Sequence, residues 1–263
     1  GFGANEEMVR EYNTYWPAIP EGIKTTCVAS ATGDGIGLAL EAGASLVDMG
    51  LTQLMPTASA VTGQLADGLL VPSQYYMFVN QEGNRFVNEY AVRGTLAAAA
   101  LSQTGGVFYH IADQAMIPTL QNMATQEDVD AMVEKGIMYK ADTLEELAEM
   151  IGCPAENLIA SVEKYNSYVD AGEDPDFGKN VFGTKIETAP YYAVIEKPSV
   201  HHTMGGVQIN TDAQVLNENG EVIEGLFAAG EVTGGIHAGN RLGGNAIADC
   251  MVFGRIAGAN AAK

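Results

Sequence analysis

The chain has 263 residues, of which 47% are hydrophobic and 31 are glycines, so it can bury the core of one large domain or of two smaller ones. Its 33 acidic residues outweigh 13 Lys and Arg, and the net charge of −20 argues against nucleic acid or an anionic membrane as a partner. No apolar run of about 18 residues could span a membrane, and the first residues, "GFGANEE", are not a signal peptide. Any export signal would lie upstream, so the localisation stays undecided between the cytoplasm and export to the cell surface.

Residues 24–50 predict a strand, a turn and a helix. An apolar stretch runs into "TGDG", and a helix rich in small residues follows. Gly33 and Gly35 in the turn allow close backbone approach to a ligand, and the helix N-terminus behind them favours an anion or a polar group. An ordinary strand-to-helix turn would have the same pattern.

The middle of the chain predicts a helical layer with a small sheet. Residues 75–89, "YYMFVNQEGNRFVNE", predict a β-hairpin, a helix follows from Arg93, and "GVFYHIAD" predicts a further strand. Residues 126–152 and 154–170 predict amphipathic helices. Their many acidic residues are typical of a solvated surface.

The last third returns to strands, with a hairpin turn at "NENGE" and a final helix of small residues from Gly244 onwards. Strand, glycine-rich turn and helix thus occur at both ends of the chain. This repetition predicts one α/β domain that is interrupted by an inserted, mainly helical domain. The expected boundaries are 1–54 and 191–263 for the outer domain and 55–190 for the insert.

Five motifs carry the strongest functional signal. They are "ATGDGIGLALEAGASLVDM", "NQEGNRFVNE" with a following Arg, "HHTMGGVQIN", "GLFAAGEVTGG" and "GNRLGGNAIADCMVFGRIAG". Together and in this order they resemble the FAD-dependent flavoprotein family of fumarate reductase and succinate dehydrogenase, above all the soluble flavocytochrome c fumarate reductases and the urocanate reductases.

The resemblance implies an α/β (α+β) fold, in which a partial FAD-binding Rossmann-like domain holds an inserted capping domain, and it implies an FAD-dependent oxidoreductase acting on CH–CH bonds. The family's GxGxxG fingerprint is missing from this sequence, and we expect it upstream. A chain that begins inside the FAD domain is expected to lack much of the FAD cradle.

The resemblance also implies which residues contact FAD. The loops around Asp34 and Glu231 would contact the flavin and its ribityl chain. The helix that begins near Gly244 would direct its backbone N–H groups at the flavin C2 carbonyl and N1, where reduced flavin carries negative charge. The expected cofactor-binding residues are Thr32, Gly33, Asp34, Gly35, Gly230, Glu231, Arg241, Gly244, Asn245, Ala246 and Ile247. The same glycines would also suit tight packing of helix on sheet.

Three residues are implied to act on the substrate, one of which, Arg241, is also in the cofactor-binding set. His202 and Arg241 correspond to the family's clamp for a substrate carboxylate, a role that suits the planar guanidinium fork of arginine. Arg93, eight residues after Arg85 of "RFVNE", corresponds to the proton donor. His201 is expected to support the site rather than to bind substrate.

The sequence departs from the family at two places. Met55 in "LMPT" replaces a histidine that clamps the far carboxylate of fumarate, and "GQLADGLLVPSQYYMFVN" lacks the Glu and Arg that feed protons to the acid. Asp67, Tyr75 or Tyr76 could substitute in that relay. We therefore expect a substrate with one carboxylate, whose other end lies against Met55. Fumarate itself is not expected to be the substrate.

The predicted function is reduction of an activated C=C bond of an unsaturated carboxylate, by hydride transfer from FAD N5 with Arg93 as proton donor. The alternatives are a flavin dehydrogenase or desaturase that runs in the reverse direction, and a cofactor-free chain without activity by itself. The expected partners are a small unsaturated carboxylate and an electron donor, which could be a haem module, an FMN module or a reduced carrier. A metal at His201 and His202 is not expected, because adjacent residues of a strand point to opposite faces.

Overall fold

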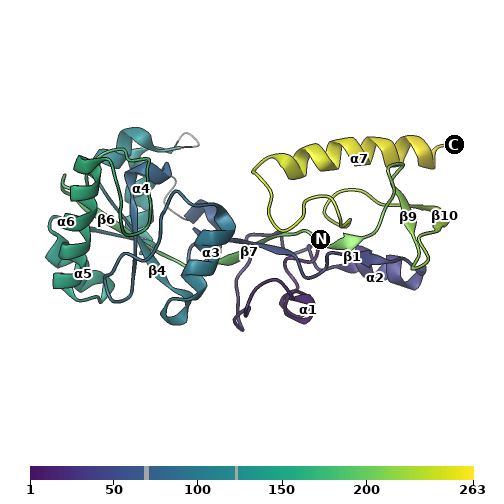
Figure 1. The fold of residues 1–263 in the computed structure, drawn as a ribbon, viewed down its shortest axis with the longest axis horizontal. Helices are drawn as coiled ribbons and strands as arrows, with labels where there is room; N and C mark the ends of the chain where they lie inside the picture. Colours follow the sequence, from purple (N-terminus) through teal and green to yellow (C-terminus); the bar gives the residue numbers. More distant parts are fainter. Residues whose placement is uncertain (68–70, 122–123) are drawn as a thin grey trace. The chain divides into compact units, whose positions relative to one another are not determined.

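The computed structural model of the chain describes residues 1–67, 71–121 and 124–263 (Figure 1). They form two compact units. The terminal unit consists of Gly1–Leu54 and Val200–Lys263, and the middle unit consists of Met55–Ser199. That the first unit binds FAD and that residues 55–190 cap the substrate stays a prediction.

Both units mix helices with short strands. The terminal unit contains α1 (Glu6–Tyr12), α2 (Asp34–Glu41), β1 (Leu46–Val47), β2 (Thr52–Met55), β7 (Ser199–Thr203), β8 (Gly206–Val207), β9 (Gln214–Leu216), β10 (Val222–Phe227) and α7 (Asn245–Ala261), with the ends of β2 and β7 reaching the unit boundary. The middle unit contains the short helices η1 (Leu65–Asp67), η2 (Ser73–Tyr75), η3 (Thr104–Gly106) and η4 (Gln114–Thr119), the strands β3 (Met77–Asn80), β4 (Phe108–Asp113), β5 (Met138–Ala141) and β6 (Tyr191–Glu196), and the helices α3 (Arg93–Leu101), α4 (Gln126–Glu134), α5 (Leu144–Ile151) and α6 (Ala155–Ala171).

The core of the middle unit lies on both faces of one antiparallel sheet with the strand order β3-β4-β6-β5. Successive side chains of a strand point to opposite faces, and the packing follows this alternation. Phe78, Phe108 and Val194 pack with residues of α3 and α4. Met77 and Ile111, on the opposite face, pack with residues of α5 and α6, which lie side by side in Figure 1.

The predicted hairpin in the middle unit is wrong in its second strand. Strand β3 forms as expected, but its ladder partner is β4, and residues 85–89 contribute only an isolated bridge between Arg85 and Val79. The physical reason is the side chain of Arg85, which is 6% exposed and bound in a buried ion cluster. A regular return strand would have to give up that contact.

The predicted helical stretch 126–152 is also interrupted, because β5 lies between α4 and α5. Gly136, with a φ of +70°, follows the end of α4 and lets the chain turn into the strand. A strand of four residues is too short for its alternation to be distinguished from the helical spacing on either side.

The terminal unit contains three two-stranded ladders, β1-β8, β9-β10 and β2-β7. Two adjacent glycines let backbone segments cross here. A Cβ atom on Gly205 would overlap the backbone of Asp48 and Met49, and one on Gly206 would overlap the carbonyl of Val232. The glycines of "TMGG" therefore have a packing role of their own, whatever they contribute to ligand binding.

Helices α2 and α7 form where the sequence predicts them. The strand expected before α2 and the packing expected for α7 are both less extensive than predicted. The strand before α2 amounts to a single parallel bridge between Thr25 and Val200. On α7, Ile247 and Met251 are each 71% exposed, so the described residues do not provide the close helix-to-sheet packing that its small residues predict.

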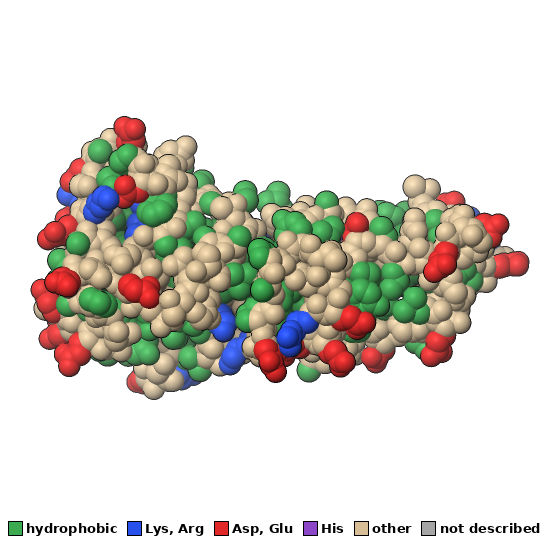
Figure 2. Space-filling view, turned by 60° about the horizontal axis from the view of Figure 1, so that its bottom comes forward, with side chains coloured by type: hydrophobic (Ala, Val, Ile, Leu, Met, Phe, Trp, Pro, Cys, Tyr) green, Lys and Arg blue, Asp and Glu red, His purple; other side chains and the backbone are tan. Residues whose placement is uncertain are grey.

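Acidic side chains are spread over the face shown in Figure 2, and Lys and Arg are sparse there. Among the helices within 1–67, 71–121 and 124–263, none is long and apolar enough to cross a membrane.

Candidate active site

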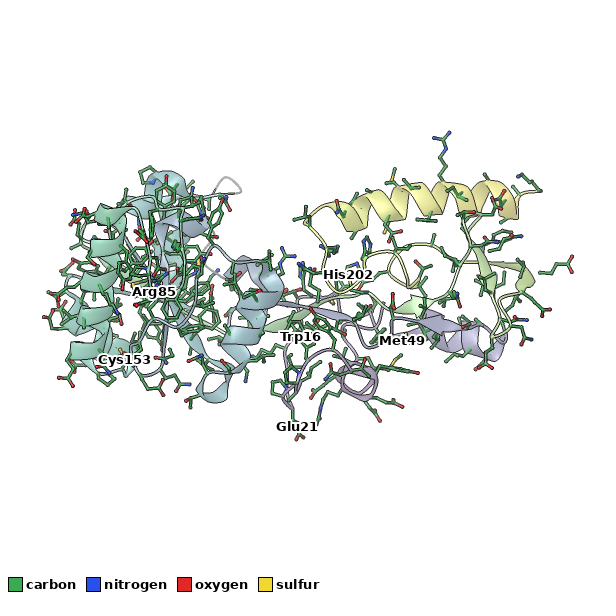
Figure 3. The ribbon with its side chains drawn as sticks, viewed as in Figure 1. Trp16, Glu21, Met49, Arg85, Cys153 and His202 are labelled. Atoms are coloured by element: carbon green, nitrogen blue, oxygen red, sulfur yellow. The ribbon has the colours of Figure 1, made fainter. Side chains whose placement is uncertain are left out.

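His202 is the most deeply buried of the predicted substrate residues in the terminal unit. It lies on β7 (Figure 3), is 3% exposed, and its Nδ1 has no hydrogen-bond partner among the described residues. Burial lowers the pKa of His202 to about 4; the carboxylate of Glu231 opposes this shift, and Arg241, His237 and His201 add to it. A neutral imidazole with an unpaired buried nitrogen is a site for a polar ligand, because leaving that nitrogen unbonded has a cost.

Arg241 reaches the same surroundings from the loop before α7. Strand β2 pairs with β7, and Gln53 of β2 donates from Nε2 to the backbone oxygen of Arg241 (3.0 Å) and to Oδ1 of Asn240 (2.5 Å). Burial lowers the pKa of the Arg241 guanidinium, while the nearby Glu231 raises it. Arg241 is among the charged groups that act on His202, and Gln53 joins the backbone of Arg241 to the strand that pairs with the strand of His202.

Glu231 is bound to the strand that carries His202. Its Oε1 accepts hydrogen bonds from the backbone N–H of Thr203 (3.0 Å) and from the hydroxyl of Thr203 (3.2 Å). His201, the neighbour of His202, contacts the hydroxyl of Thr26 through Nδ1 (2.7 Å). This contact gives His201 a local structural partner, as a supporting role would require.

The sequence reasoning missed a second pair in this region. Nε2 of His237 lies 3.1 Å from Oδ2 of Asp249, and the two side chains are 10% and 4% exposed. The ring of His237 stands edge-on to the ring of His202, with the ring centroids 5.5 Å apart. His237 stands four residues before Arg241 in "HAGNR". In a chain with only four histidines, this short spacing from a predicted substrate residue could have marked His237 as a candidate.

The N-terminus of α7 fits the predicted flavin site. Gly244 caps the helix at a φ of +88°; among the described residues no side chain makes a capping hydrogen bond, and apart from its chain neighbours no atom lies within 4 Å of the position that a Cβ would take. Asn245, Ala246 and Ile247 form the first turn of this helix of 17 residues. An open helix N-terminus of this length favours a bound negative charge, as a reduced flavin would present.

The other predicted cofactor residues lie in tightly packed turns. Gly33 caps α2 at a φ of +89°, and a Cβ there would meet Met8 and Phe2. The hydroxyl of Thr32 donates to Oδ1 of Asp34 (2.7 Å), so the "TGDG" turn is closed by its own side chains. The remaining members of the predicted set are Gly35, whose Cβ would lie 3.0 Å from Val232, and Gly230, at a φ of +78° with a Cβ position 3.1 Å from Sγ of Cys250.

Arg93 and Met55 belong to the middle unit. Arg93 is the first residue of α3 and is half-buried; Met55 ends β2, is 5% exposed, and its Sδ lies 3.8 Å from the hydroxyl of Thr57. Their roles toward the substrate stay predictions. Of the stretch that lacks the family's proton relay, residues 68–70 lie outside the described residues.

The candidate replacements in that relay have ordinary local contacts. Asp67 accepts from the hydroxyl of Thr62 (2.6 Å), and Tyr76 donates to Ser73 (3.1 Å). Burial raises the pKa of Tyr76, which makes it a poorer acid than an exposed tyrosine. Tyr75 ends a short helix, and its ring occupies the space where a Cβ on Gly183 would lie.

An ion cluster fixes the segment that leads to Arg93. Arg85, labelled inside the middle unit in Figure 3, binds Glu89 through Nε and Nη2 (2.8 Å each) and Asp174 through Nη1 (2.8 Å). Lys179 lies 3.2 Å from Glu89 and is fully buried. Within 1–67, 71–121 and 124–263, no group of three or more His, Cys, Asp or Glu is placed to hold a metal ion.

Comparison with known proteins identifies the family. A model of the FAD binding domain family matches residues 8–247, and the chain belongs to this family. The chain is 52% identical to an NADH:acrylate oxidoreductase of Vibrio harveyi over 261 residues (99% of this chain, 26% of the relative), and 42% identical to a urocanate reductase of Eggerthella lenta over 264 residues (100% of this chain, 43% of the relative).

Among solved structures, the chain is similar to the open conformation of a flavocytochrome c3 fumarate reductase, with a TM-score of 0.79 and 40% identity, covering 100% of this chain and 44% of that one. These findings confirm the predicted flavoprotein family, the fold class and FAD as cofactor. The chain spans less than half the length of these relatives.

Proposed function

We propose that the protein containing this chain is an FAD-dependent reductase of the C=C bond of a small unsaturated monocarboxylate. The observation that carries the proposal is the buried Nδ1 of His202, which has no hydrogen-bond partner among the described residues, in the unit that also contains Arg241 and the open N-terminus of α7. The known relatives named for acrylate and urocanate support the reaction class. Acrylate is a monocarboxylate, which agrees with the replacement of the second carboxylate clamp by Met55.

In this proposal, the chain's residues bind one end of the substrate and complete the addition at the other. Arg241 and His202 bind the carboxylate, Arg241 through its two-pronged guanidinium and His202 as a neutral donor. Their pull on the carboxylate draws electron density from the C=C bond, which makes the carbon beyond it a better hydride acceptor. Bound FAD supplies the hydride.

Arg93 donates the proton to the carbon next to the carboxylate, which yields the saturated acid and leaves Arg93 to be reprotonated. An arginine is a weak acid, so the step requires the developing negative charge on that carbon to lie against the guanidinium. Met55 presents an apolar surface to the end of the substrate that has no carboxylate. The electron donor is proposed as a reduced carrier, and the name of the Vibrio harveyi relative supports NADH as its source.

The test is a substrate panel on the whole, flavin-loaded protein under anaerobic conditions. Reduced protein is mixed with acrylate, fumarate or urocanate, and flavin oxidation and the saturated product are measured. We expect acrylate to be reduced much faster than fumarate, and Arg241→Gln to abolish turnover while the exposed Arg255→Gln does not. Reduction of fumarate as fast as of any monocarboxylate would refute the substrate class, and no reduction of any enoate would refute the reductase.

A direction test follows from the same preparation. Oxidised protein mixed with propionate, without oxygen or another electron acceptor, should remain oxidised over the time in which reduced protein consumes acrylate. Faster bleaching of the flavin by the saturated acid would favour the dehydrogenase alternative.

A further inference from the structure

His237 and Asp249 bracket the loop that carries Arg241. The 3.1 Å contact between Nε2 of His237 and Oδ2 of Asp249 joins the residue before this loop to the second turn of α7. The enclosed segment, residues 238–244, contains Arg241 and the helix cap Gly244. Joining the two ends of a short loop removes conformations in which its side chains would point elsewhere.

Gln53 holds the same loop at its centre. Its amide donates to Asn240 and to the backbone oxygen of Arg241, and Gln53 itself is 2% exposed on β2. The loop is therefore tied at both ends by His237 and Asp249 and in the middle by Gln53. These three contacts fix the backbone from which the Arg241 side chain extends.

His237 also limits the movement of His202. Its ring stands at 87° to the ring of His202 with the centroids 5.5 Å apart, so His202 packs against an edge that Asp249 keeps in place. A carboxylate partner requires the proton of His237 to sit on Nε2, in the neutral and in the charged ring alike. Asp249 thus sets both the tautomer and the orientation of the ring that faces His202.

We propose that His237 and Asp249 are positioning residues of the carboxylate clamp: their hydrogen bond closes the loop that carries Arg241 and fixes the ring of His202, so that both side chains are directed at one carboxylate. The proposal rests on the proposed function. It also explains why a polar pair stands at this buried position, where Oδ1 of Asp249 has no hydrogen-bond partner among the described residues. Such a pair has a cost that structural stability alone would avoid with apolar residues.

The electrostatic surroundings of His202 give a readout that a purely structural pair would not change. Of the charged groups that act on His202, the negative Glu231 raises its pKa. Arg241, His237 and His201 lower it, because a positive charge nearby disfavours the protonated ring. Replacing His237 removes one lowering influence. His237→Gln should therefore raise the pKa of His202 above its value of about 4.

The first experiment is histidine NMR on the whole, flavin-loaded protein, in which single variants assign the signals of His202 and His237. We expect the ring proton of His237 on Nε2, and an upward shift of the His202 titration in His237→Gln. A proton on Nδ1 of His237 overturns the proposal in the wild-type chain alone, even if a variant fails to fold. An unchanged His202 titration in a folded His237→Gln also overturns it.

The second experiment measures acrylate kinetics and FAD content of the whole, flavin-loaded protein. In His237→Gln and Asp249→Asn we expect the KM to rise about tenfold, the effect of one charge-assisted hydrogen bond, with FAD content unchanged. The exposed Asp212→Asn is the matched control. An unchanged KM in both variants contradicts the proposal. If the wild-type protein reduces no enoate, the proposed function fails, whereas the NMR result still decides whether the pair orients His202.

Discussion

Replacing Glu89 by Gln should strongly destabilise the middle unit. The Glu89 side chain is fully buried and accepts from Arg85 Nε and Nη2 (2.8 Å each), from the backbone N–H of Phe78 (3.1 Å), and from Lys179 Nζ, which lies 3.2 Å away. With Asp174, which binds Arg85, the cluster holds two negative and two positive charges. Glutamine keeps the shape, but it leaves one net positive charge buried and turns an amide donor toward other donors.

Removing one partner of a buried ion pair costs about 3–5 kcal/mol. With a urea dependence of about 2 kcal/mol per M, the unfolding midpoint of the middle unit should fall by roughly 2 M. Far-UV circular dichroism follows the helices of this unit, and the fluorescence of Trp16, the single tryptophan of the chain, reports on the terminal unit.

The matched control is Glu149→Gln on the exposed surface of α5, which should change the stability by less than about 0.5 kcal/mol. A loss below about 1 kcal/mol in Glu89→Gln would mean that the buried charges do not hold the unit together, and the reasoning would be refuted.

Two further predictions concern the terminal unit. Gly206→Ala should lower its stability by about 2 kcal/mol or more, because the added Cβ overlaps the carbonyl of Val232. Gly258→Ala, on the open side of α7, should instead stabilise the helix by about 0.5–1 kcal/mol, and urea unfolding of the two variants measures both effects. His202, with a pKa lowered from 6.5 to about 4, binds fewer protons in the folded than in the unfolded chain between these values, so the stability should rise as the pH increases through this window, by at most about 3 kcal/mol. His202→Gln should flatten that rise, and an equally steep rise in the variant would contradict the assignment.

The sequence predicted the helices better than the strands. Helices α2, α3 and α7 follow from glycine turns and apolar spacing, which are local signals. The failed return strand at residues 85–89 depends on Arg85, whose partner Asp174 lies far away in the chain, and no local pattern reveals such a contact. Burial of a charged residue by distant partners is a tertiary effect that overrides strand propensity.

The site shows the same division. His202 and Arg241 were predicted because their motifs resemble those of a family, and in the structure Gln53 of β2 joins the loop of Arg241 to the strand that pairs with β7. His237 and Asp249 were missed, since a histidine in a glycine-rich loop and an aspartate in a helix have no meaning until the loop closes and brings them to 3.1 Å. Only the folded chain shows that the pair encloses Arg241.

The most direct test of the central claim is the oxidation of the reduced flavin by acrylate in wild-type and Arg93→Ala whole protein, followed by rapid-mixing absorbance without oxygen. We predict that acrylate oxidises the wild-type flavin and yields one propionate per flavin, while Arg93→Ala retains its flavin and reacts at a rate lower by about 10²–10⁴-fold, the range for loss of a general acid. Equal rates in the two proteins would remove Arg93 from the mechanism, and a wild-type flavin that acrylate leaves reduced would contradict the proposed reaction.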